Sequence, residues 1–128
     1  MKLEHVAINV PDPKAFAQWY VDNLGMQIVR ALPDPPYMTF IADSAGQSML
    51  EIYNDVAAGV PDYSTIHHQN LHFAFSADDM EGTIARLEAA GASQIGTTTT
   101  TPLGDQLAFL RDPWNVTVQL VKRKTPML

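Results

Sequence analysis

Hydrophobic and polar residues follow two periods along this chain, and the first half shows both. Residues 2–9 alternate as a strand does, and Pro11-Asp12-Pro13 ends the alternation. Four large apolar residues then recur at helical spacing up to Gly25, which predicts a helix over 13–24 with Asp12 as its N-cap: Phe16, Trp19, Tyr20 and Leu24. Three more strands are predicted at 26–32, 37–42 and 47–54, separated by turns rich in proline, aspartate and glycine. The first half therefore predicts the order β-α-β-β-β.

The second half repeats this order. A strand is predicted at 70–76 and a helix at 79–90, with Ile84, Leu87 and Glu88 on one face and Gly91 as its cap. Strands follow at 93–99, 106–111 and 116–122. Residues 55–69 show no sustained period, and we expect a linker with one helical turn.

Two pairs of polar residues mark the repeat. His5 and His72 lie near the start of the first strand of each half, at an offset of 72 − 5 = 67. Glu51 and Gln119 lie in the last strand of each half, at an offset of 119 − 51 = 68. At 128 residues the chain has the size of one domain, so two copies of a half-domain must share a core or exchange with a partner chain.

Composition excludes several classes of protein. The net charge is −6, and no basic cluster precedes Lys122-Arg123-Lys124, which we interpret as a solvated chain end; no nucleic-acid partner is expected. The chain has no cysteine, which excludes disulfides, thiol nucleophiles and zinc-thiolate sites. No apolar run is long enough for a signal or a membrane span, so we expect a cytoplasmic protein without a membrane partner.

Strand alternation brings the four repeated polar residues to matching faces. His5, Glu51, His72 and Gln119 would supply two imidazoles, one carboxylate and one amide oxygen, a plausible first shell for a divalent transition metal. A lone strand histidine is commonly an ordinary core or surface residue, and Glu51 and Gln119 could simply face solvent. Their joint placement on two related pairs of repeat positions favours ligation.

Two other polar runs are interpreted without a site. His67 and His68 are adjacent, so in an extended segment their side chains should point opposite ways, and we assign them to the linker. The threonine run 97–101 is explained by the strand preference of threonine, with Pro102 ending the strand.

The chain resembles the vicinal oxygen chelate superfamily, which includes glyoxalase I, bleomycin-resistance proteins and extradiol dioxygenases. The resemblance rests on five features: His5 in Glu4-His5-Val6-Ala7-Ile8-Asn9-Val10, the helix ending at Leu24-Gly25-Met26, Glu51 in Leu50-Glu51-Ile52, His72 opening the second half, and Asp112-Pro113-Trp114-Asn115 ahead of Val118-Gln119-Leu120. It implies an α+β fold in which two tandem βαβββ modules form a U-shaped cleft around a metal. One domain over 1–128 would comprise modules 1–54 and 70–124 joined by linker 55–69, and the resemblance also implies a homodimer.

The resemblance also implies a site and a reaction. The ligand set of glyoxalase I-like lyases falls on His5, Glu51, His72 and Gln119, with one divalent ion (Ni, Zn, Fe, Co or Mn). Glutamine stands where the family usually has glutamate, which leaves Glu51 as the proton carrier. The expected function is a metal-dependent lyase or isomerase acting on a small substrate with vicinal oxygens through an enediolate.

Substrate and alternatives follow from the same comparison. Asn9 occupies the position where glutathione-using relatives carry arginine, which disfavours a glutathione hemithioacetal. We expect substrate contacts from Asn9, Phe40 and Tyr53, and apolar walls from Met38, Phe40, Tyr53, Phe73 and Phe75. One alternative is an iron dioxygenase using His5, His72 and Glu51, although that family's carboxylate usually comes from the last strand. Another is a metal-free small-molecule binder of the bleomycin-resistance type, against which the intact histidine pair counts.

Overall fold

The computed structural model describes residues 1–127. The chain divides into two compact units, unit 1 over Met1–Pro61 and unit 2 from Asp62 onward. The division falls inside the segment 55–69 that we expected to be a linker. A single domain over 1–128 stays a prediction, and its last residue, Leu128, lies outside the described residues.

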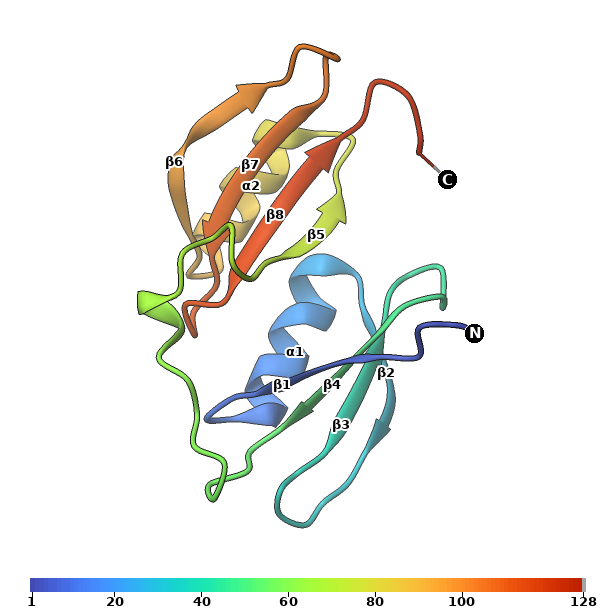
Figure 1. Cartoon of the computed structure of the whole chain (residues 1–128), viewed down its shortest axis with the longest axis vertical. Helices are drawn as coiled ribbons and strands as arrows, with labels where there is room; N and C mark the ends of the chain where they lie inside the picture. The colour runs from blue at the N-terminus through green and yellow to red at the C-terminus, as the bar shows by residue number, and fades with distance from the viewer. Residues whose placement is uncertain (128) are drawn as a thin grey trace. The chain divides into compact units, whose positions relative to one another are not determined.

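Unit 1 has the β-α-β-β-β order that its sequence predicts (Figure 1). Its elements are β1 (Val6–Asn9), α1 (Pro13–Leu24), β2 (Gln27–Ala31), β3 (Thr39–Ala42) and β4 (Met49–Tyr53). The strands form one sheet in the order β1-β4-β3-β2, with β1 parallel to β4 and the other neighbours antiparallel. Short turns join the antiparallel strands, while the longer connection through α1 leads from β1 to the opposite edge of the sheet.

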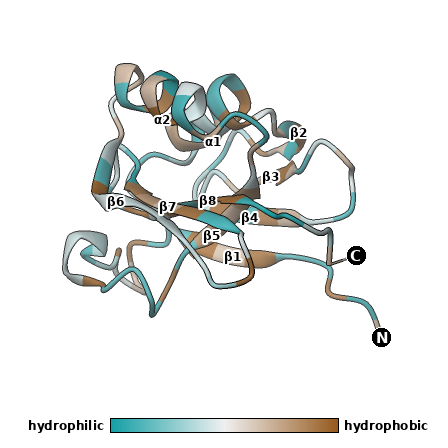
Figure 2. Cartoon of the chain, turned by 90° about the horizontal axis from the view of Figure 1, so that it is seen from above, coloured by the Kyte–Doolittle hydropathy of each residue, from teal (hydrophilic) through white to brown (hydrophobic). Residues whose placement is uncertain are grey.

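Helix α1 forms where its end signals are strongest and covers one face of this sheet. The Asp12 carboxylate accepts a hydrogen bond from the Ala15 N–H, and Gly25 ends the helix at φ 68°, a left-handed conformation that favours glycine. Phe16 and Tyr20 are fully buried, and hydrophobic and polar residues alternate around both helices (Figure 2). The alternation in β4, where Leu50 and Ile52 are buried and Glu51 between them is partly exposed, leaves Glu51 on the face away from α1.

Unit 2 repeats this architecture and has one turn of 3₁₀ helix in front of it. Its elements are η1 (Tyr63–Thr65), β5 (Phe73–Ser76), α2 (Met80–Ala89), β6 (Ser93–Thr100), β7 (Gln106–Arg111) and β8 (Thr117–Lys122). The sheet order β5-β8-β7-β6, with β5 parallel to β8, is that of unit 1. The predicted α+β fold of two βαβββ modules is confirmed.

Two expectations about side-chain direction in unit 2 are wrong. Glu88 is exposed, and the apolar face of α2 consists of Met80, Ile84 and Leu87. Phe73 and Phe75 pair with Val118 and Leu120, whose side chains are buried on the α2 side of the sheet. The two phenylalanines therefore cannot line the open face.

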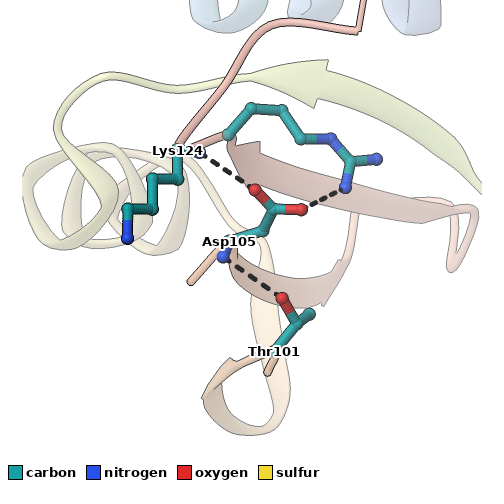
Figure 3. Close-up of polar contacts among 4 residues, drawn as sticks. Thr101, Asp105 and Lys124 are labelled. Atoms are coloured by element: carbon teal, nitrogen blue, oxygen red, sulfur yellow. Dashed lines mark hydrogen bonds and ion pairs between the residues drawn. The ribbon is translucent and has the colours of Figure 1, made fainter. Parts of the chain in front are cut away.

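The end of β8 is anchored, although Lys122, Arg123 and Lys124 are exposed, as expected for a solvated chain end. The buried Asp105 carboxylate accepts hydrogen bonds from the Arg123 guanidinium at 2.8 Å and from the Lys124 backbone N–H at 2.9 Å (Figure 3). The Asp105 N–H in turn donates to the Thr101 hydroxyl at 3.2 Å. These contacts hold the chain after β8 against the β6–β7 turn.

Strand β2 contains a bulge that changes which of its residues face the open side. Ile28 pairs with Ile41, but the next pair is Arg30 with Phe40, so Val29 is an extra residue without a partner. In a regular ladder Val29 would lie opposite Phe40 and Arg30 opposite Thr39. The bulge therefore places Arg30 opposite Phe40 and on the face that carries Phe40.

Candidate functional site

The open face of each sheet carries the same row of positions. In unit 1, Ala7 of β1 pairs with Glu51 of β4, and Glu51 pairs with Phe40 of β3. His5 precedes Ala7 by two residues and therefore lies on the same side of the strand path. The corresponding row in unit 2 is Ala74, Gln119 and Phe109, again with a histidine, His72, two residues ahead of the alanine.

In unit 1 the predicted ligands His5 and Glu51 lie side by side. The His5 Nε2 atom is 3.0 Å from a carboxylate oxygen of Glu51, and the imidazole rests edge-on against the Phe40 ring with centroids 5.8 Å apart. The side chains are 35% and 16% exposed, respectively, so both remain accessible from solvent. The pair is pre-formed on the open face.

Glu4, which was not among the predicted site residues, contacts the second ring nitrogen of His5, Nδ1. Its carboxylate accepts a hydrogen bond from Nδ1, which leaves Nε2 directed at Glu51. The Glu4 hydrogen bond raises the pKa of His5 above its ordinary value; partial loss of hydration opposes this rise, and the negative charges of Glu4 and Glu51 add to it. A carboxylate behind a histidine is a common orienting partner for imidazole ligands.

In unit 2 the backbone orients the histidine. His72 donates from Nδ1–H to the His68 carbonyl at 2.8 Å, which leaves Nε2 as the unprotonated nitrogen. Its ring meets Phe109 edge-on with centroids 5.5 Å apart. Gln119 lies between Ala74 and Phe109 in the same row, so its amide shares the face with His72. Each unit thus has a histidine and an oxygen-bearing side chain on the same face of its sheet.

The adjacent histidines His67 and His68 do not point opposite ways as expected. Their rings stack with centroids 4.1 Å apart, and the His68 ring lies 4.6 Å from that of Phe109. The segment is not extended here, because a turn closes through a hydrogen bond from the Asn70 N–H to the His67 carbonyl. Burial lowers the pKa of His68, and the positive charges of His67, Arg111 and His72 add to this effect.

Arg111 holds the segment that carries these histidines. Its guanidinium donates to the carbonyls of Tyr63, Ile66 and Asn115 at 2.8, 2.6 and 2.8 Å, respectively. Sequence reasoning missed this role, because backbone carbonyls are present at every position and leave no local pattern. The arrangement fixes the residues immediately before His67 against the end of β7.

Asn9, which we expected to contact the substrate, has a structural role in unit 1. Its amide nitrogen donates to the carbonyls of Asp55 and Gly59 at 2.9 and 3.0 Å, and its oxygen accepts from the Asp55 N–H at 2.9 Å. Asn9 is only 8% exposed, so the amide is committed to the loop after β4. The other two expected contacts, Phe40 and Tyr53, are partly exposed and share the face of Glu51.

The unit 1 pair fits a divalent metal. Ligand atoms bound at ~2.0–2.2 Å and at right angles to each other lie about 3 Å apart, as the His5 Nε2 and the Glu51 oxygen do. Imidazole and carboxylate are ligands that nickel, zinc, iron, cobalt and manganese accept. Within residues 1–127, no group of three or more histidine, aspartate and glutamate side chains is close enough to hold a metal.

Known proteins are similar to this chain in sequence and in fold. The family model described as the Glyoxalase/Bleomycin resistance protein/Dioxygenase superfamily matches residues 2–120. A lactoylglutathione lyase from Haemophilus influenzae is 26% identical over 131 aligned positions, which cover 98% of this chain and 95% of that protein. Among residues 1–127, no helix is long and apolar enough to cross a membrane.

Solved structures of low sequence identity show the same fold. A glyoxalase family protein from Bacillus cereus matches with a TM-score of 0.81 at 14% identity, covering 95% of this chain and 93% of that one. An antibiotic binding protein from Streptomyces sp. CB03234 matches with a TM-score of 0.70 at 21% identity, covering 97% and 99%. One fold therefore accompanies both enzyme-like and binding relatives.

Proposed function

Because the chain belongs to the Glyoxalase/Bleomycin resistance protein/Dioxygenase superfamily, we propose that it is a metal-dependent lyase or isomerase acting on a small substrate with two adjacent oxygens. The observation that carries the proposal is the contact between His5 Nε2 and Glu51 on the open face of unit 1. In this proposal His5, Glu51, His72 and Gln119 are the ligands of one divalent ion. When bound, the ion would act as a Lewis acid toward the substrate oxygens.

Glu51 is the residue that moves the proton. A carboxylate can accept a proton from a carbon next to the substrate oxygens and return it to the neighbouring carbon. Gln119, at the equivalent position of unit 2, can offer an amide oxygen but no basic group. Glu4 orients His5 through its hydrogen bond to Nδ1, so Glu51 is not needed to orient this ring. The similarity to a lactoylglutathione lyase supports a lyase activity.

A test of the metal separates this proposal from its main alternative. Protein stripped with a chelator and reloaded with each candidate metal should retain about one equivalent after desalting, and His5→Ala or His72→Ala should lose it. Lys14→Ala, on α1, is the matched control and should retain the metal. Wild-type protein that retains none of these ions would refute the proposal.

Isosteric exchange then tests the base. Glu51→Gln keeps an oxygen donor and should still bind metal, but it should not exchange the substrate α-proton with deuterium. Gln119→Glu keeps Glu51, so it should bind metal and also exchange the proton. NMR of hemithioacetals formed by methylglyoxal with glutathione and with 2-mercaptoethanol provides the assay. Proton exchange by metal-loaded Glu51→Gln at the wild-type rate would remove Glu51 from this role.

The alternative is a small-molecule binding protein. The stacked rings of His67 and His68, with the Phe109 ring tilted against His68, favour it, because they offer flat π-surface to a planar ligand. The fold shared with an antibiotic binding protein is in line with it. Tight binding of planar aromatic compounds by metal-free protein, lost in His68→Ala, would support this function. The predicted homodimer applies to either function, and light scattering of the purified protein checks it.

A further inference from the structure

The bulge in β2 decides which residue of β3 lies opposite Arg30. Because Val29 is left without a partner, Arg30 stands opposite Phe40, and Phe40 stands opposite Glu51. Side chains of residues directly paired across a sheet point to the same face. The cation therefore shares the open face of unit 1 with the proposed metal ligands.

The register also sets how far Arg30 lies from the proposed ligands. Two strand spacings separate its backbone from that of Glu51, which corresponds to about 10 Å. Phe40 occupies the intervening position and contacts His5 with its ring. A ligand whose oxygens meet His5 and Glu51 could run over Phe40 and place its far end at Arg30.

The guanidinium of Arg30 is available. Residue 30 is exposed, and within residues 1–127 its side chain has no hydrogen bond or ion pair. Arg111 and Arg123, in unit 2, are in contrast committed to backbone carbonyls and to Asp105. On a chain with a net charge of −6, an unpaired arginine on a face that also carries carboxylates is a local site for an anion.

The second unit shows that the sheet does not require a cation there. Ile95 pairs with Phe109, which pairs with Gln119, so an apolar residue occupies the position equivalent to Arg30. The irregularity in β6 also lies at a different position, because it comes after Ile95, whereas the bulge in β2 comes before Arg30. Arg30 therefore occurs in unit 1, the unit that also carries the proposed carboxylate ligand Glu51.

We propose that Arg30 binds an anionic group, a carboxylate or a phosphate, at the end of the substrate remote from its two adjacent oxygens. This inference rests on the proposed function and adds a substrate class to it: small anionic molecules with about 10 Å between the oxygen pair and the anion. Guanidinium groups bind carboxylate and phosphate through paired N–H donors. Arg30 then determines specificity and takes no part in proton transfer.

A pair of probes tests the inference. The monohydroxamate of suberic acid carries two adjacent oxygens that chelate metals at one end and a carboxylate at the other, and its methyl ester is the neutral match. Calorimetry with metal-loaded wild type should show the acid binding about fivefold to tenfold more tightly than the ester, an advantage that decreases at high salt. In Arg30→Met the ratio should fall to about one, with ester affinity and metal content unchanged. Arg30→Lys should keep part of the preference.

Lys14→Met is the matched control, because it removes one positive charge from unit 1 on α1, which covers the opposite face of the sheet. It should leave the ratio at the wild-type value. Equal binding of acid and ester by wild type would overturn the inference while leaving the proposed function intact. Failure to bind metal or either probe would overturn both, and an equal loss of preference in Lys14→Met would show a general charge effect and overturn the role of Arg30.

Discussion

Replacing Asn9 by alanine should destabilise unit 1 without any involvement of a ligand. The change removes three hydrogen bonds that join β1 to the loop at Asp55 and Gly59. At ~0.5–1.5 kcal/mol for each bond the loss is about 1.5–4.5 kcal/mol. The loop residues are exposed, so water can replace Asn9 as their partner, and we expect about 2 kcal/mol, near the lower end.

Urea unfolding followed by tryptophan fluorescence measures this loss. The chain has two tryptophans, and in a Trp114→Phe background Trp19 on α1 reports on unit 1. With an m-value of ~1–3 kcal/mol per M, a loss of about 2 kcal/mol should lower the midpoint of Asn9→Ala by about 0.7–2 M. Asn9→Asp keeps the acceptor for the Asp55 N–H but loses both donated bonds, so its midpoint should lie between those of wild type and Asn9→Ala.

The repeat supplies the control. Ser76 occupies the position of unit 2 equivalent to Asn9, at an offset of 76 − 9 = 67, and it is exposed. Ser76→Ala should change stability by no more than ~0.5 kcal/mol, measured in a Trp19→Phe background. A midpoint for Asn9→Ala within error of wild type would refute the reasoning. An equal loss in Ser76→Ala would show that the cost does not come from the three bonds.

Three further changes test other contacts. Glu4→Gln weakens the orientation of His5 and should reduce metal affinity about tenfold, measured by competition with a coloured chelator, whereas Glu81→Gln on α2 should have no effect. The hydrogen bond from the Lys124 N–H lowers the pKa of Asp105 most, and the Arg123 guanidinium lowers it further. The ionised Asp105 should therefore stabilise the fold fully above about pH 4, and this stabilisation should be lost as the pH falls through the lower pKa of the folded state. In Asp105→Asn the urea midpoint should depend less on pH in that range. Burial lowers the pKa of His68, so the unfolded chain binds a proton at a higher pH than the folded chain, and stability should fall as the pH drops below about 6.5. His68→Gln should reduce the slope of the urea midpoint against pH in this range. An unchanged slope would contradict the burial of His68.

Element order and the ends of the helices could be predicted because their signals are local. Asp12-Pro13 and Gly25 enclose α1 over the predicted residues 13–24, and β7 over 106–111 was also predicted without error. The first strand was predicted too long, as 2–9 instead of 6–9, because pairing with β4 begins only at Val6 and Leu50. A strand ends where its partner ends, which its own sequence does not encode.

The candidate site divides in the same way. His5 and Glu51 could be found because their repeat offsets match those of His72 and Gln119, and the structure brings His5 and Glu51 into contact. The bulge that places Arg30 could not be found, because strand alternation predicts the opposite face for it. The stacking of His67 and His68 follows from a loop held by distant hydrogen bonds, which strand geometry did not anticipate.

The unlike rows of the two units have a consequence for how a ligand could be oriented. Two identical copies of a βαβββ unit would present the same chemistry twice, and an unsymmetrical molecule would have two equivalent ways to bind. Here one row carries Arg30 and Glu51, whereas the other carries Ile95 and Gln119. The chain therefore has a charged row in unit 1 and a neutral row in unit 2, and a charged end of a ligand finds its match in the first row.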